Sequence, residues 1–106
     1  VMAARKRFPK LAVEVEVESL RECASAIKAK PEWIMLDNMS TADMRKCVKM
    51  CRGISKTEAS GGITLERAKE VARTGVTAIS LGCLTHSAGS IDLSLEWNEA
   101  SCRRRR

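Results

Sequence analysis

Aromatic side chains are scarce in this 106-residue chain, which has two Trp, one Phe and no Tyr. Proteins that bind single-stranded nucleic acid stack bases on several aromatic rings, so the scarcity argues against such a surface. The chain also lacks any apolar run near the about 20 residues that a membrane span needs. Residues 1–10 hold basic side chains but no apolar stretch of the kind found in signal peptides. We therefore expect no association with membranes.

Metal-binding cysteine patterns are missing too. Five cysteines are present, but no two are separated by only two residues, and the chain has a single His. Cys47 and Cys51 would share one face of a helix, yet a zinc site there would need two further ligands. We expect reduced thiols and a cytoplasmic location.

Positive charge exceeds negative charge, but it is unevenly distributed. The formal net charge is +6, with 19 basic and 13 acidic residues and a pI near 9.4. Eight of the basic residues lie in residues 1–10 and 103–106, whereas all the acidic ones lie between Glu14 and Glu99. Residues 11–102 therefore carry a net charge of −2. This distribution predicts nonspecific adhesion of the ends to polyanions and no specific nucleic-acid binding.

Apolar periodicity predicts alternating strands and helices. Strands are expected at residues 11–17, 33–36, 55–59 and 76–81, with a further apolar segment at 91–95. Ser19, Ser40 and Thr64 stand where N-caps of three intervening helices should be, and those helices should end near Lys28, Cys51 and Gly75. A βα unit recurring about every 21 residues is typical of parallel α/β folds. The sequence thus predicts the C-terminal part of an open α/β barrel.

The first strand alternates Val with Glu, which is unusual for a parallel strand covered on both faces. Two interpretations fit: Glu14 and Glu16 face a barrel interior or an active-site mouth, or they lie on the solvated face of an edge strand.

Polar residues and glycines follow each predicted strand, where parallel α/β folds gather their ligands. The residues that should meet on this rim are Glu16, Glu18, Asp37, Asn38, Glu58, Ser60, Gly61, Gly62, Ser80, Gly82, Thr85, His86 and Ser87. Ser60-Gly61-Gly62 precedes a helix, so its backbone N–H groups could cradle a phosphate. Glu16 and Asp37 could accept hydrogen bonds from sugar hydroxyls or hold Mg²⁺. A phosphate site beside carboxylates that accept from sugar hydroxyls indicates that the ligand is a sugar phosphate.

Each of these features also has a purely structural interpretation. The glycine pair could serve turn geometry alone, and Asp37-Asn38 could form an ordinary turn after its strand. Glu58 could be a solubilising charge, and His86 a structural histidine. Their joint position on one rim favours the functional interpretation.

Five strings are specific in combination: EVEVESL, IMLDNMS, EASGGIT, ISLGCLTHS and IDLSL, at residues 14–20, 34–40, 58–64, 79–87 and 91–95. In this order and at these spacings they resemble the C-terminal part of quinolinate phosphoribosyltransferase, or nicotinate-nucleotide pyrophosphorylase (carboxylating). The resemblance covers residues 11–96. It implies a basic N-terminal tail at 1–10, a partial α/β-barrel phosphoribosyltransferase domain at 11–96 and a basic C-terminal tail at 97–106.

The resemblance also implies an enzymatic chemistry. The family makes nicotinate mononucleotide, CO₂ and pyrophosphate from quinolinate and Mg²⁺-bound phosphoribosyl pyrophosphate, in NAD biosynthesis. By resemblance, Glu16 and Asp37 are the catalytic residues, bind the ribose hydroxyls and contact the Mg²⁺. The resemblance further implies substrate-binding roles, chiefly at the 5′-phosphate, for Ser60, Gly61, Gly62, Ser80, Gly82 and His86.

Several departures from the family bear on activity. The family's basic residues that hold the quinolinate carboxylates and the pyrophosphate lie upstream of Leu11, in an N-terminal sandwich domain and the first barrel strands. Family members are at least homodimers, and a second subunit completes each site. We therefore expect a fragment or truncated form that is inactive alone. The alternatives are another phosphate-binding α/β-barrel enzyme and a non-enzymatic module with basic tails.

Overall fold

A parallel four-stranded sheet organises the chain. The computed structural model describes residues 1–84 and 93. The strands are β1 (Glu14–Val17), β2 (Trp33–Asp37), β3 (Lys56–Ser60) and β4 (Ala78–Ile79), adjacent in chain order. The helices that connect them are α2 (Leu20–Lys28), α3 (Thr41–Cys51) and α4 (Leu65–Ala72). A short helix α1 (Met2–Arg7) precedes the sheet, and a 3₁₀ helix η1 (Gly82–Leu84) follows it.

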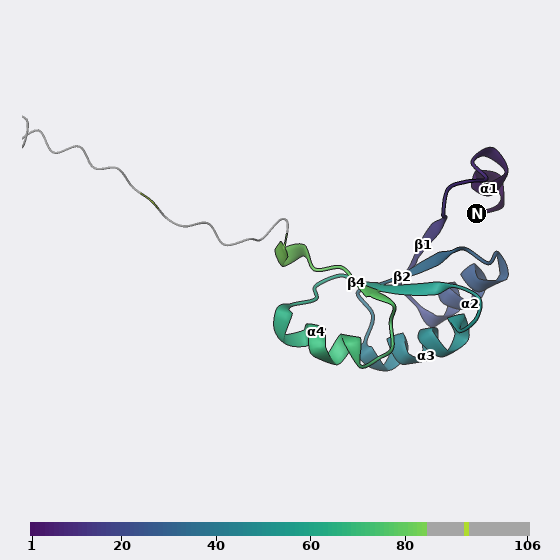
Figure 1. The fold of residues 1–106 in the computed structure, drawn as a ribbon. Coiled ribbons are helices and arrows are strands. Elements are labelled where there is room, and N and C mark those ends of the chain that lie inside the picture. Colours follow the sequence, from purple (N-terminus) through teal and green to yellow (C-terminus); the bar gives the residue numbers. More distant parts are fainter. Residues whose placement is uncertain (85–92, 94–106) are drawn as a thin grey trace, which may run out of the picture.

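The three connecting helices lie on the same side of the sheet (Figure 1). Crossovers between parallel strands are almost always right-handed, so strands added in one direction place every helix on one face. That is how an α/β barrel is wound, with helices outside and strands inside. The predicted fold, consecutive parallel βα units of an open α/β barrel, is confirmed.

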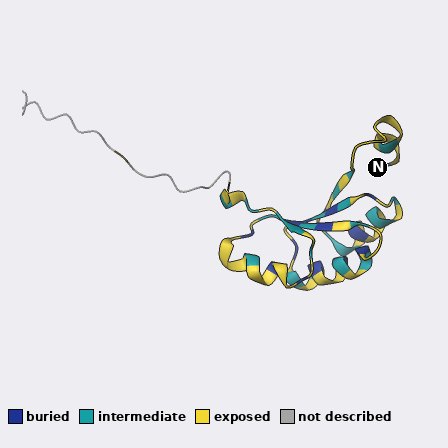
Figure 2. Cartoon of the chain, in the orientation of Figure 1, coloured by how far each residue is buried: buried dark blue, intermediate teal, exposed yellow. Residues whose placement is uncertain are grey.

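The core lies between the sheet and its helices (Figure 2). Alternate strand residues point to each face, so Val17, Ile34, Leu36 and Ala59 are buried against the helices. Their neighbours Glu14, Glu16, Trp33, Met35, Lys56 and Glu58 occupy the other face, which no helix among residues 1–84 covers. The carboxylates of β1 are therefore on the face that becomes the interior of a closed barrel. Within the described chain β1 is also an edge strand, so the two interpretations of its alternation are compatible.

The predicted helix starts are correct. The hydroxyl oxygens of Ser19, Ser40 and Thr64 accept hydrogen bonds from the backbone N–H groups three residues on, at 3.3, 3.1 and 3.4 Å. Each hydroxyl satisfies one of the donors that a helix leaves unpaired at its start. Because these helices start directly after the strand ends, the caps fix where each polar loop leaves the sheet.

The strands differ from prediction at their ends. The first begins at Glu14 rather than at residue 11, because the N–H of Val13 donates to the Glu32 carboxylate at 2.8 Å instead of joining the ladder. The third ends one residue later than expected, at Ser60. The fourth was expected over 76–81 but spans only Ala78–Ile79, although Thr77 and Ser80 still donate to carbonyls of β3. The segment at 91–95 lies outside the described residues, except Leu93.

Helix α1 was not expected from the sequence. Its Arg5 guanidinium donates to the carbonyl of Lys30 at 2.6 Å and to the Glu32 carboxylate at 2.8 Å. Glu32 thus joins α1 to the start of β1, and its pKa is lowered, first by the hydrogen bond from Val13. Within residues 1–84, no helix has both the length and the apolar character required to cross a bilayer.

Candidate functional site

The polar residues predicted to meet at the carboxyl ends of the strands fall into two neighbouring groups. The acidic group consists of Glu16, Glu18 and Asp37 and belongs to β1 and β2. The glycine loop, residues 60–62, begins at the last residue of β3 and faces the segment after β4. Asp37 pairs in register with Ser60, so the two groups adjoin.

The acidic group is compact. One carboxylate oxygen from each of its three residues lies within 4.8 Å of the other two. Glu16 and Glu18 are exposed and Asp37 is half-buried. Hard divalent cations take oxygen ligands at about 2.0–2.6 Å, so this donor set suits Mg²⁺ or Ca²⁺. Sequence reasoning placed Glu18 on the rim but did not include it among the metal ligands.

Asn38 connects the acidic group to the glycine loop. Its side-chain amide donates to the Asp37 carboxylate at 2.6 Å, and its backbone N–H donates to the carbonyl of Ser60 at 3.1 Å. Asn38 has a positive φ of 52°, a conformation that Asn tolerates better than most residues. The turn after β2 therefore orients the Asp37 carboxylate and holds the end of β3.

Only glycine fits at position 61, because the backbone there lies against Asn38. A Cβ on Gly61 would lie 2.7 Å from the backbone nitrogen of Asn38 and closer still to its side chain. The φ of Gly61 is +81°, which L-residues rarely adopt. Gly62 also has a positive φ, of +55°, but a Cβ there would meet only the Asn38 side chain, at 3.9 Å. Because neither glycine has a side chain, a ligand can approach the backbone of this loop closely.

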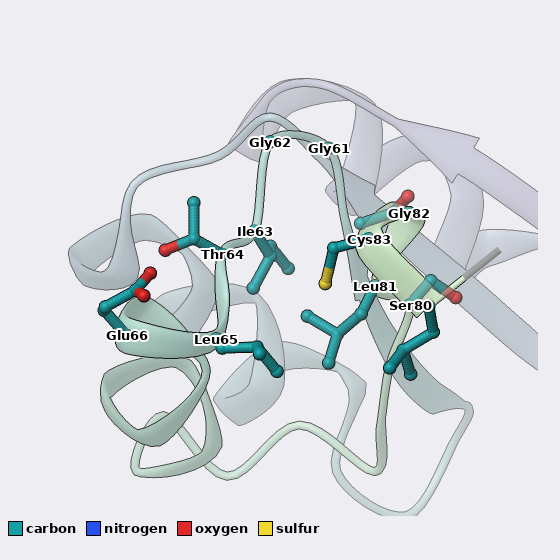
Figure 3. Close-up of a pocket in the computed structure, with 12 residues that line it drawn as sticks. Gly61, Gly62, Ile63, Thr64, Leu65, Glu66, Ser80, Leu81, Gly82 and Cys83 are labelled. Atoms are coloured by element: carbon teal, nitrogen blue, oxygen red, sulfur yellow. The ribbon is translucent and has the colours of Figure 1, made fainter. Parts of the chain in front are cut away.

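A cavity of about 920 Å³ opens beside the glycine loop (Figure 3). Its walls are the loop, the first turn of α4 and the segment from Ser80 to Leu84. The predicted residues Ser60, Gly61, Gly62, Ser80 and Gly82 all line it. The apolar part of the wall, which includes Ile63, Leu65 and Leu81, was not expected from the sequence. Nothing in the apolar pattern distinguishes these side chains from ordinary core residues.

One carboxylate lies in the cavity wall. Glu66 is in the first turn of α4, and a hydrogen bond from Thr64 and then one from its own backbone N–H lower its pKa. An acidic side chain is favourable at a helix start. It also competes with a bound anion for that end of α4, so the backbone of Gly61 and Gly62 is the better candidate for phosphate contact.

Two other carboxylates extend across the open face of the sheet. The Ser80 hydroxyl donates a short hydrogen bond to Glu58, joining the segment after β4 to β3. Glu14, two strands away on β1, has a raised pKa, first because of partial burial and then because of the negative charge of Glu58. Negative charge therefore accumulates on the face that carries the acidic group.

The structure places most predicted site residues on one rim. Glu16 and Asp37 lie in the acidic group, and the glycine and serine residues line the adjoining cavity. Glu16 and Asp37 do not themselves line that cavity. His86 falls outside the described residues.

Comparison with known proteins identifies the family. A sequence model of the quinolinate phosphoribosyl transferase C-terminal domain matches residues 1–96. The chain belongs to this family. Residues 1–10, which carry the unexpected helix α1, fall within the match.

Relatives agree with the assignment. The chain is 45% identical over 84 residues to a probable nicotinate-nucleotide pyrophosphorylase (carboxylating) of Bacillus subtilis, covering 79% of this chain and 29% of that one. It is 42% identical over 90 residues to a mitochondrial quinolinate phosphoribosyltransferase of Nicotiana tabacum, covering 76% and 26%. The solved structure of the nicotinate-nucleotide pyrophosphorylase from Francisella tularensis superposes with a TM-score of 0.79 at 41% identity. That match covers 88% of this chain and 34% of the Francisella chain, so the present chain spans about a third of such proteins.

Proposed function

We propose that this chain carries the ribose 5-phosphate half of a quinolinate phosphoribosyltransferase site. In this proposal Ser60, Gly61, Gly62 and Gly82 bind the 5′-phosphate, with Ser80 beside them. Glu16 and Asp37 face the ribose. The complete enzyme would make nicotinate mononucleotide, CO₂ and pyrophosphate from quinolinate and phosphoribosyl pyrophosphate, as the family does.

The contact between Gly61 and Asn38 is the observation that supports this proposal most strongly. It holds the glycine loop against the turn that orients Asp37. A sugar phosphate needs a phosphate site and hydroxyl acceptors within the length of one molecule. A rigid link between the two groups provides that arrangement, and fixed geometry is what lowers the entropic part of a reaction barrier.

The residues suit displacement at C1 of the ribose. As the bond from C1 to the pyrophosphate oxygen breaks, positive charge develops on C1 and the ring oxygen. Carboxylates of Glu16 and Asp37 near the ribose would stabilise that charge. The glycine loop would hold the 5′-phosphate so that the ring cannot drift from the incoming pyridine nitrogen.

The donor chemistry of the acidic group also fits a divalent cation. Three carboxylates whose oxygens lie within 4.8 Å of one another are ligands of the type that Mg²⁺ prefers. Bound there, Mg²⁺ would offset the negative charge of a diphosphate. Glu16, Glu18 and Asp37 are the residues that would hold it.

We expect the 106-residue chain to be inactive alone, because the family's basic residues for quinolinate and pyrophosphate lie upstream of Leu11. The measurement is nicotinate mononucleotide formation by the purified chain with quinolinate, phosphoribosyl pyrophosphate and Mg²⁺. Turnover above background would contradict this expectation. The same assay with nicotinate in place of quinolinate tests the alternative, because turnover of nicotinate would favour another phosphate-binding α/β-barrel enzyme.

Calorimetry with ribose 5-phosphate tests whether the 106-residue chain binds a sugar phosphate. Gly62→Asp is the variant of choice, since the space beside Gly62 is more open than that beside Gly61. Its new carboxylate should repel the phosphate and weaken binding at least about tenfold, or 1.4 kcal/mol. Ala24→Asp, at an exposed position of α2, adds the same charge away from the rim and should bind like the unmodified chain. The proposal fails if no phosphate-dependent heat appears with or without Mg²⁺.

A further inference from the structure

A second cavity lies at the opposite end of the strands from the candidate site. It has a volume of about 420 Å³ and opens between the C-terminal ends of α3 and α4, below the starts of β3 and β4. Its cationic lining residues are Arg45, Lys49, Arg52 and Arg73. We call this cavity the basic groove. It shares no residue with the cavity beside the glycine loop.

The charges of the basic groove are not neutralised within the described part of the chain. No carboxylate is among its lining residues. Of the cations in residues 1–84, only Arg5 and Lys46 form ion pairs, and neither lines the groove. Four positive side chains around one cavity contrast with the net charge of −2 over residues 11–102.

Helix stability does not account for all four cations. Arg52 and Arg73 are C-cap residues and Lys49 lies in the last turn of α3, where positive charge is favourable. Arg45 is near the middle of α3, four residues before Lys49 on the same helix face, and like charges at that spacing are unfavourable. A ligand that carries several negative charges would turn this unfavourable arrangement into a favourable one.

The chemistry of the lining points to phosphate. Arginine forks bind phosphate oxygens through two hydrogen bonds at once, and three of the four cations are Arg. The hydroxyls of Ser55 and Thr74 already donate to the carbonyls of Pro31 and Val71, so the guanidinium and ammonium groups are the main donors to a ligand. The volume exceeds that of a single phosphate and is within the range of small-molecule pockets.

We propose that the basic groove is a second anion site, which binds the polyphosphate group of a phosphorylated small molecule. The basic groove is separate from the proposed ribose 5-phosphate site, so either proposal can be contradicted without affecting the other. The shared ligand chemistry is a chain of phosphates, whether free or attached to a nucleoside.

The test is an NMR titration of the 106-residue chain with inorganic triphosphate in Mg²⁺-free buffer at constant ionic strength. Amide signals of Arg52, Gly53 and Gly75 report the basic groove, and those of Gly61 and Gly62 report the rim. The proposal predicts saturable shifts at the groove amides. Shifts no larger than those caused by sodium chloride would overturn it.

Matched variants identify the contacts. Arg52→Ala with Arg73→Ala should weaken triphosphate binding at the groove amides at least tenfold and leave any shifts at Gly61 and Gly62 unchanged. The control, Arg67→Ala with Lys69→Ala, removes two exposed cations of α4 that do not line the groove and should change nothing there. Equal weakening by both pairs would show general charge attraction and contradict a defined site. Replacing Arg103 to Arg106 with Ser should also leave the groove affinity unchanged.

Two further ligands distinguish the source of the polyphosphate. Adenosine triphosphate should bind the groove about as tightly as inorganic triphosphate, while adenosine should cause no shifts. Tighter binding of adenosine triphosphate by more than tenfold would mean that the nucleoside is part of the recognised ligand. Binding of adenosine alone would contradict the phosphate assignment.

Discussion

The two halves of the rim are built in different ways. The glycine loop after β3 is fixed by its backbone, because Gly61 packs against Asn38 with no room for a side chain. The acidic group after β1 and β2 consists of exposed or half-buried side chains that repel one another. The conformation of the glycine loop is therefore set by the fold, whereas the acidic group needs a cationic ligand to balance its negative charge. Substitution at Gly61 should therefore chiefly affect stability, whereas substitutions in the acidic group should affect ligand binding and leave stability almost unchanged.

The largest expected effect is on stability, from Gly61→Ala. The positive φ alone costs about 1–2 kcal/mol for an L-residue, and the overlap with Asn38 adds about 1–3 kcal/mol of overpacking. Gly53→Ala is the matched control, since Gly53 has a similar φ of +75° and nothing within 4 Å of a new Cβ. Urea unfolding should show Gly61→Ala as the more destabilised variant by at least about 1 kcal/mol. Equal losses would mean that the contact with Asn38 does not constrain the loop.

An intermediate effect is expected on cation binding, from Glu16→Gln combined with Asp37→Asn. Neutral amides are weaker ligands for hard cations, so affinity for Mg²⁺ should fall at least tenfold. Thermal unfolding should change little, because these side chains are not part of the buried core. Calorimetry with Mg²⁺ checks the first expectation. Ribose 5-phosphate binding measured without Mg²⁺ should weaken, because Glu16 and Asp37 face the ribose, but persist through the phosphate contacts of the glycine loop. If the double variant lost ribose 5-phosphate binding as well as Mg²⁺ binding, the two halves of the rim would not act separately.

The smallest effect concerns the charges on the open face of the sheet. Glu58→Gln should lower the pKa of Glu14, but only part of the way to its ordinary value of 4.5, because burial is the larger cause of the upward shift. A raised folded-state pKa means that the contribution of Glu14 to stability is present below pH 4.5 and is lost as pH rises through the folded-state pKa. Glu14→Gln should therefore stabilise the fold slightly at pH 7. Carbon-13 NMR titration of Glu14 measures its pKa directly. An unchanged Glu14 pKa in the Glu58→Gln variant would show that Glu58 does not repel Glu14.

Much of the fold was predictable because its signals are local. An N-cap residue followed by a run of helical periodicity indicates where a helix starts, so Ser19, Ser40 and Thr64 located three helices correctly. Strand ends depend on pairing with distant segments, and the fourth strand proved much shorter than its apolar run suggested. Helix α1 is joined to the rest of the fold by the contacts of Arg5 with Lys30 and Glu32, which no local pattern reveals.

The shared location of the candidate residues was predictable from the sequence, but their geometry was not. The position of Glu16, Asp37 and the glycines after successive strands was enough to place them on one rim. The role of Asn38 as a link between Asp37 and Gly61 follows only from the three-dimensional contact. The sequence likewise gave no sign that the cations of α3 and α4 would meet around one cavity.

The most direct test of a two-part rim is an NMR titration with ribose 5-phosphate, first without and then with Mg²⁺. We predict shifts at Gly61, Gly62 and Gly82 in the absence of the metal. Larger shifts at Glu16, Glu18 and Asp37 should appear when Mg²⁺ is added. No further shift at the acidic group on addition of Mg²⁺, or none at the glycines under either condition, would contradict a two-part rim.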